Sequence, residues 1–173
     1  MKKHCTYLIA IAGLLLCALV SATSAQQETG ATIVVNAENR TSSIAVVVNP
    51  DNPITSISAA DLRRIFSGEK QSWGNNLPVF PVVRASGARE REVLLSQLLK
   101  MSEQEYKRYW LQKVYSGESH QEPVALFSNG MQLEAVRAKK GAIALINAQD
   151  VREGVKIIKV DGYTPGTPGY SFK

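Results

Sequence analysis

The stretch that decides the fold reads Pro81-Val82-Val83-Arg84-Ala85-Ser86-Gly87-Ala88-Arg89-Glu90. The apolar run at 79–83 predicts a buried strand, and the small residues Ser86 and Gly87 predict a turn. The polar residues after that turn predict the start of a helix. A strand that leads through a short turn into a helix is a basic unit of α/β proteins.

The same junction predicts an anion-binding site. The first amides of a helix have no intrahelical acceptors, and the helix dipole makes that end partly positive. Ser86 and Gly87 let an anion approach the backbone, while Arg84 and Arg89 add two positive charges beside it. The alternative interpretation is that Ser86 only caps the helix and that both arginines are solvated surface residues.

Further strand signals lie on both sides of this junction. They are runs of β-branched and apolar residues bounded by turn-forming residues. The expected strands are 31–37, 44–49, 79–83, 142–146 and 155–160.

Helix signals alternate with these strands. Ser58 is followed three residues later by Asp61, and Ser102 by Glu105, as in a capping box. Ser128 is a third N-cap candidate, and an apolar face at 93–99 predicts a helix after the Ser86-Gly87 turn. The alternation predicts a three-layer α/β domain with a mostly parallel or mixed sheet.

The helix expected after Ser102 carries Tyr106, Tyr109, Trp110 and Lys113. These residues could form an aromatic ligand platform. At helical spacing, however, aromatic side chains more often pack against the core. We therefore expect them to be packing residues.

The beginning of the chain predicts export. Lys2 and Lys3 precede an apolar run at 7–20, and small residues follow at 21–25, which is the pattern of a secretory signal peptide. Cleavage is expected after Ala25, with Ala22 as the alternative. The run is short for a membrane span, which needs about 20 residues, so we expect a periplasmic or secreted protein.

We expect four segments along the chain. Residues 1–25 form the signal peptide, and 26–43 form an N-terminal segment that holds the expected strand at 31–37. Residues 44–161 form the domain, and 162–173, rich in Pro and Gly, form a flexible tail.

Composition excludes several classes of function. The formal net charge of +5 falls by two when Lys2 and Lys3 leave with the signal. This mild charge fits an anionic ligand but lacks the dense basic clusters of a nucleic-acid-binding protein. Cys5 and Cys17 both lie in the signal, and His120 is then the single histidine of the mature chain. We therefore expect no metal site, no cofactor and no Cys/His nucleophile pair.

Three segments carry a resemblance to a known family. They are Ile44-Ala45-Val46-Val47-Val48-Asn49-Pro50-Asp51-Asn52-Pro53, then Ser58-Ala59-Ala60-Asp61-Leu62-Arg63-Arg64-Ile65-Phe66-Ser67-Gly68 with Trp73, and Lys140-Gly141-Ala142-Ile143-Ala144. In this order they resemble the second lobe of periplasmic phosphate-binding proteins of the ABC transporter type. The resemblance implies one lobe of a type II periplasmic binding protein, in a shortened, single-lobe form.

The resemblance also implies a ligand site. The family binds its ligand with a Ser-Gly-Thr turn at a helix start and an arginine nearby. Here Arg84 matches the arginine, Ser86 and Gly87 match the first two turn residues, and Ala88 stands where threonine is usual. With Arg89 from the charge argument, these are the candidate ligand-binding residues. If one lobe encloses a ligand by itself, the loop around Trp73 is the first candidate lid.

The resemblance implies a solute-binding protein for phosphate or another oxyanion, linked to ABC-type phosphate transport or sensing. Its expected partners are an ABC permease or another envelope protein, and a second copy of the chain that could complete the cleft. The alternative is an envelope module that keeps the lobe fold but docks a protein. We do not expect an enzyme, because Ser86 has no evident base in the sequence.

Overall fold

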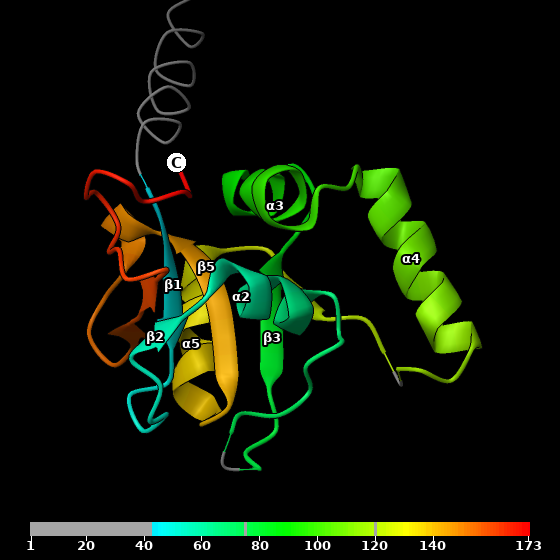
Figure 1. Cartoon of the computed structure of the whole chain (residues 1–173), viewed down its shortest axis with the longest axis horizontal. Helices are drawn as coiled ribbons and strands as arrows, with labels where there is room; N and C mark the ends of the chain where they lie inside the picture. Colours follow the sequence, from blue (N-terminus) through cyan, green and yellow to red (C-terminus); the bar gives the residue numbers. More distant parts are fainter. Residues whose placement is uncertain (1–42, 75, 120) are drawn as a thin grey trace, which may run out of the picture.

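The computed structural model describes residues 43–74, 76–119 and 121–173. A five-stranded sheet with the order β4-β3-β5-β1-β6 forms its centre (Figure 1). Its strands are β1 (Ile44–Val48), β3 (Phe80–Arg84), β4 (Val124–Leu126), β5 (Ala142–Asn147) and β6 (Lys156–Ile157). A second, two-stranded sheet pairs β2 (Ser56–Ile57) with β7 (Lys159–Val160) in parallel.

Helices cover both faces of the central sheet. They are α2 (Ala59–Phe66), α3 (Arg89–Val93), α4 (Glu103–Tyr115) and α5 (Asn129–Ala138). A π-helical segment, η1 (Leu94–Leu99), continues α3, and a short 3-10 helix, η2 (Ala148–Asp150), follows β5. Figure 1 shows α2 and α5 on opposite sides of the sheet.

Strand β1 joins the two halves of the core. All five of its side chains are fully buried, so the protein covers this strand on both faces of the sheet. Ile44, Val46 and Val48 pack into the cluster that contains α2, η1 and α4, while Ala45 and Val47 pack into the cluster with α5. The predicted three-layer α/β architecture is therefore confirmed.

The sheet is mixed. Strand β3 pairs in parallel with both β4 and β5, whereas β1 pairs antiparallel with β5 and with β6. The carboxyl ends of β3, β4 and β5 consequently meet at one edge of the sheet. In open α/β sheets ligands bind outside the carboxyl ends of the strands, so this edge is the place to look for a site.

The predicted helix starts are confirmed. The Ser58 hydroxyl accepts a hydrogen bond from the Asp61 amide, and the Ser128 hydroxyl accepts one from the Met131 amide. Ser102 forms the full capping box with Glu105, because each side chain accepts from the other residue's backbone amide. These caps satisfy amides that a helix leaves without intrahelical partners.

Tyr106, Tyr109 and Trp110 of α4 are packing residues, as expected. Tyr106 and Trp110 are 2% and 3% exposed, and the Tyr109 hydroxyl donates to the Ser67 carbonyl oxygen. Trp110 packs closely against Gly68, because an added Cβ at Gly68 would lie 2.6 Å from a ring atom of Trp110. None of the helices within the described residues is long and apolar enough to cross a membrane.

Two expectations about the end of the chain are wrong. The strand expected at 155–160 is split between two sheets, because the fully buried Ile158 donates its amide to Val46 and the chain then crosses to β2. The tail at 162–173 is packed rather than loose. Tyr170 and Phe172 are each 3% exposed, and the Tyr170 hydroxyl donates to the Ile44 carbonyl oxygen at 2.7 Å.

Two short strands were not expected. Strand β2 has two residues and β4 has three, too few for a periodic signal. The signal peptide and the strand expected at 31–37 lie outside the described residues.

Trp73 belongs to the core and does not form a lid. It is 3% exposed, and its indole Nε1 donates to the Gly141 carbonyl oxygen at 3.1 Å. This contact precedes β5, so it lies at the opposite end of the sheet from the carboxyl edge. At Gly141 the chain passes so close to Pro78 that an added Cβ would lie 1.8 Å from the Pro78 carbonyl oxygen.

The caps give a first prediction. Ser58→Ala and Ser102→Ala should each lower the free energy of unfolding by about 1 kcal/mol, because each leaves a helix amide without its partner. Urea denaturation followed by circular dichroism measures the loss. Ser96→Ala is the control, since its exposed hydroxyl bonds only to the Glu92 carbonyl oxygen within the helix. Equal stability of all three variants would contradict the capping assignment.

The close approach at Gly141 gives a second prediction. Gly141→Ala should cost about 3 kcal/mol, because the backbone of Pro78 must move to admit a methyl group. Gly74→Ala is the matched control, because an added Cβ there meets nothing within 4 Å. Thermal unfolding of both variants separates the outcomes, and a Gly141→Ala protein as stable as the control would show that this contact is not tight.

Candidate functional site

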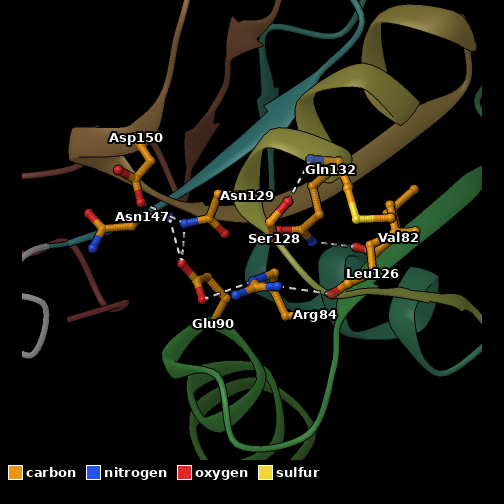
Figure 2. Close-up of polar contacts among 10 residues, drawn as sticks. Val82, Arg84, Glu90, Leu126, Ser128, Asn129, Gln132, Asn147 and Asp150 are labelled. Atoms are coloured by element: carbon orange, nitrogen blue, oxygen red, sulfur yellow. Dashed lines mark hydrogen bonds and ion pairs between the residues drawn. The ribbon is translucent and has the colours of Figure 1, made fainter. Parts of the chain in front are cut away.

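Arg84 lies at the carboxyl end of β3, and its side chain turns toward the neighbouring strand ends. Its guanidinium Nη1 donates to the Leu126 carbonyl oxygen at 3.0 Å, and its Nε lies 3.5 Å from Oε2 of Glu90 (Figure 2). The Arg84 side chain is 15% exposed and that of Glu90 is 6% exposed. The positive charge predicted to attract an anion therefore already faces a carboxylate of the same chain.

Glu90 is held by groups from three elements. Besides Arg84, its Oε1 accepts from the side-chain amide of Asn129 at 2.8 Å and from the backbone amide of Asn147 at 3.3 Å. Asn129 begins α5 and also donates to Asp150 Oδ2 at 2.7 Å, while Asn147 ends β5. Figure 2 shows the Glu90 carboxylate between Arg84 and Asn129. We call Arg84, Glu90, Asn129 and Asn147 the Glu90 cluster.

The turn after Arg84 opens onto the surface. Gly87 has a positive φ of 86°, a conformation that glycine adopts without strain. Ser86 and Gly87 are exposed, and among the described residues their amides and the Ser86 hydroxyl have no hydrogen-bond partner. The N-cap of α3 is Ala88, which makes no side-chain cap bond, so Ser86 does not cap the helix.

A surface hollow of about 500 Å³ adjoins this turn. Its lining residues are Ser86, Gly87, Arg91, Glu92, Leu95, Ser96, Met101 and Glu103. Arg91 is paired through Nε and Nη2 with both carboxylate oxygens of Glu103, at 3.1 and 3.0 Å, and its guanidinium lies 4.0 Å from the ring centre of Tyr106. With one arginine and two glutamates, the hollow itself does not concentrate positive charge.

The ion pair in this hollow shifts the pKa of its carboxyl group. The hydrogen bonds from Arg91 hold the pKa of Glu103 below its ordinary value. Burial raises the pKa of the neighbouring Tyr106 hydroxyl to about 12, so this group stays protonated at neutral pH. The pair ties the start of α4 to α3 and fixes the wall of the hollow.

The structure separates the predicted site residues into two groups. Arg84 belongs to the buried Glu90 cluster, whereas Ser86 and Gly87 lie on the open turn. Ala88 is the N-cap of α3, and Arg89 Nη1 lies 4.0 Å from Glu92 Oε2 on the same helix. The five residues lie within one short stretch, but the two arginines face different carboxylates, those of Glu90 and Glu92.

Sequence reasoning missed Glu90, Asn129, Asn147 and Asp150. Each is a polar residue at the end of a strand or near an end of a helix, where turn chemistry is the ordinary explanation. One usable signal was Asn147, the polar residue that ends the apolar run 142–146. If β5 pairs in parallel with β3, as it does, Asn147 lies beside the carboxyl end of β3. Only the order of strands shows which of these residues meet.

No group of three metal-ligating side chains occurs within the described ranges, and His120 lies outside them. Another hollow, of about 360 Å³, lies at the amino end of β3, between Phe80, Trp110 and residues 117–119 and 121–123. It is remote along the strand from Arg84.

A protein-family model described as a PBP superfamily domain matches residues 17–169 of the chain. Solved structures agree on the fold. An ABC-type phosphate transport receptor from Vibrio cholerae superposes with a TM-score of 0.57 at 20% sequence identity, covering 72% of this chain and 48% of the receptor. PstS from Borrelia burgdorferi superposes with a TM-score of 0.56 at 18% identity, covering 72% of this chain and 49% of that protein. The chain thus spans about half the length of these proteins.

The Arg91–Glu103 pair gives a third prediction. Because the pKa of Glu103 is lowered in the folded protein, its ion pair adds stability above the unfolded pKa near 4.5, and that stability is lost as the pH falls through the folded pKa. Glu103→Gln should therefore lose less stability than the wild type between pH 6 and pH 3, as measured by urea midpoints. Glu69→Gln, at an exposed carboxylate, controls for the lost charge. Parallel pH curves for the wild type and Glu103→Gln would contradict this role.

Proposed function

Because the chain belongs to the PBP superfamily domain family, we propose that it is an exported solute-binding protein that takes an oxyanion such as phosphate at the turn 86–89. The family and the fold support a solute-binding role over an enzymatic one. The proposal includes a periplasmic location, which follows from the signal-peptide pattern at the beginning of the chain. It also includes a link to ABC-type phosphate transport or sensing, because one solved protein of the same fold is described as an ABC-type phosphate transport receptor.

One observation carries this proposal: unpaired amides lie at the carboxyl edge of the sheet. Ser86 and Gly87 are exposed residues, and nothing lies within 4 Å of the position that a Gly87 Cβ would take. An anion can therefore reach the backbone there, where α/β sheets bind their ligands. The Ser86 hydroxyl supplies a further donor of the kind that oxyanions accept.

The arrangement supports weak binding. Glu90 opposes the Arg84 charge, and the turn faces solvent on one side, where charge-assisted hydrogen bonds lose much of their strength. We expect a Kd no better than about the millimolar range for the monomer, which corresponds to roughly 4 kcal/mol of favourable free energy. Tighter binding requires a second wall, supplied by a partner protein or another copy of the chain.

A second candidate function is protein docking through the same edge of the sheet. Phe127 and Met131, beside the end of β4 and in the first turn of α5, are 79% and 46% exposed. Apolar side chains beside a neutralised arginine favour a protein surface over a small anion. In this version the domain keeps the lobe fold and has lost measurable phosphate affinity.

The fourth prediction separates these two functions. Phosphate at 20 mM, about twenty times a millimolar Kd, should raise the melting temperature of the wild type above its value in sodium chloride of equal ionic strength. The reason is that a ligand that binds only the folded state stabilises that state. Ser86→Glu should abolish this effect by placing a carboxylate in the open turn. Gln112→Glu adds the same charge on the exposed side of α4 and should retain the effect.

Calorimetric titration with phosphate, sulfate and acetate then ranks the anions. If phosphate gives the wild type no stabilisation beyond that of chloride, the oxyanion proposal fails and the docking function becomes the better explanation.

A further inference from the structure

The Glu90 cluster has the composition of an anion-binding site that is already occupied. A guanidinium, a side-chain amide and a backbone amide converge on one carboxylate that is 5% exposed. These are the donor types that bind oxyanions in proteins. Here they come from the ends of β3 and β5 and the start of α5, so the sheet edge itself assembles them.

The donors are not all well matched to Glu90. The Nε atom of Arg84 is buried and lies 3.5 Å from the carboxylate, longer than a charge-assisted bond of about 2.8 Å. An intramolecular carboxylate, whose position is dictated by helix α3, meets this guanidinium less completely than a free anion could.

We propose that Glu90 is an internal competitor for the external oxyanion, so that its carboxylate sets the low affinity of this edge of the sheet. Glu90 reduces the positive charge that Arg84 presents to an external anion near the turn. To reach Arg84 and Asn129, that anion must displace the Glu90 carboxylate. This inference rests on the proposed function only in taking the carboxyl edge as the anion site.

A purely structural role for Glu90 predicts a different outcome. If the carboxylate only ties α3 to β5, its removal lowers stability and leaves anion affinity unchanged. If it is a competitor, its removal lowers stability and raises anion affinity, because the Arg84 charge is left without a counterion. Affinity therefore distinguishes the two roles where stability does not.

The experiment measures phosphate binding to the full chain by calorimetry for the wild type, Glu90→Ala and Glu90→Gln. We expect Glu90→Ala to bind phosphate at least about tenfold more tightly than the wild type, a change of about 1.4 kcal/mol. The control Glu69→Gln, which removes one exposed carboxylate, should leave the Kd unchanged within about twofold. The double variant Arg84→Ala/Glu90→Ala should lose the gain, because the cation that receives the anion is gone.

If a Glu90 variant is too unstable for calorimetry, its stabilisation by added acetate can be measured instead. Sodium acetate, compared with sodium chloride at equal ionic strength, should raise the melting temperature of Glu90→Ala by several degrees more than that of the wild type, because acetate replaces the missing carboxylate. Glu90→Gln keeps the size of the side chain and serves if Glu90→Ala does not fold.

These experiments distinguish failure of the Glu90 inference from failure of phosphate binding by the wild type. If Glu90→Ala and Glu90→Gln bind phosphate no better than the wild type and acetate gives no rescue, the inference is overturned even where the wild type binds phosphate. If only the Glu90 variants bind, phosphate binding by the wild type fails as a function and the internal competitor is supported.

Discussion

A buried carboxylate must have its charge met within the protein, and this constraint on Glu90 organises the carboxyl edge of the sheet. The free energy cost of burying an unpaired charge is high, so Arg84, Asn129 and Asn147 have to be held where they reach it. Each of these residues lies at the end of a strand or the start of a helix. The positions of β3, β5 and α5 relative to one another are thereby linked through one functional group.

The core makes that linkage rigid. Strand β1 is buried on both faces, and its antiparallel pairing with β5 fixes β5 beside β3. At the other end of the sheet, Gly141 lets the entry to β5 pass against Pro78, and Trp73 seals that contact with a hydrogen bond to Gly141. Close packing at the amino edge thus positions the polar residues at the carboxyl edge, about 20 Å away for strands of five or six residues.

The sequence was informative where the signal is local. The serine caps, the apolar strand 44–48 and the turn at 86–87 each depend on neighbouring residues, and the structure places them as predicted. The pairing of Arg84 with Glu90 was not predicted, although the two lie six positions apart, because the turn between them decides whether they face each other. Burial of Tyr170 was also missed, since a Pro and Gly-rich segment gives no periodic signal of packing.

The proposed competition between Glu90 and an external anion is the reason we expect a single lobe of this kind to hold an anion weakly. A binding protein with two lobes can surround a ligand with donors from both sides and exclude water, which strengthens each interaction. In one lobe a buried arginine without a counterion would destabilise the fold whenever the ligand is absent. An internal carboxylate removes that penalty, and it also removes the charge that the ligand would use. Under this proposal, stability of the empty lobe and affinity for an anion oppose each other at Arg84, and Glu90 favours stability of the empty lobe over affinity.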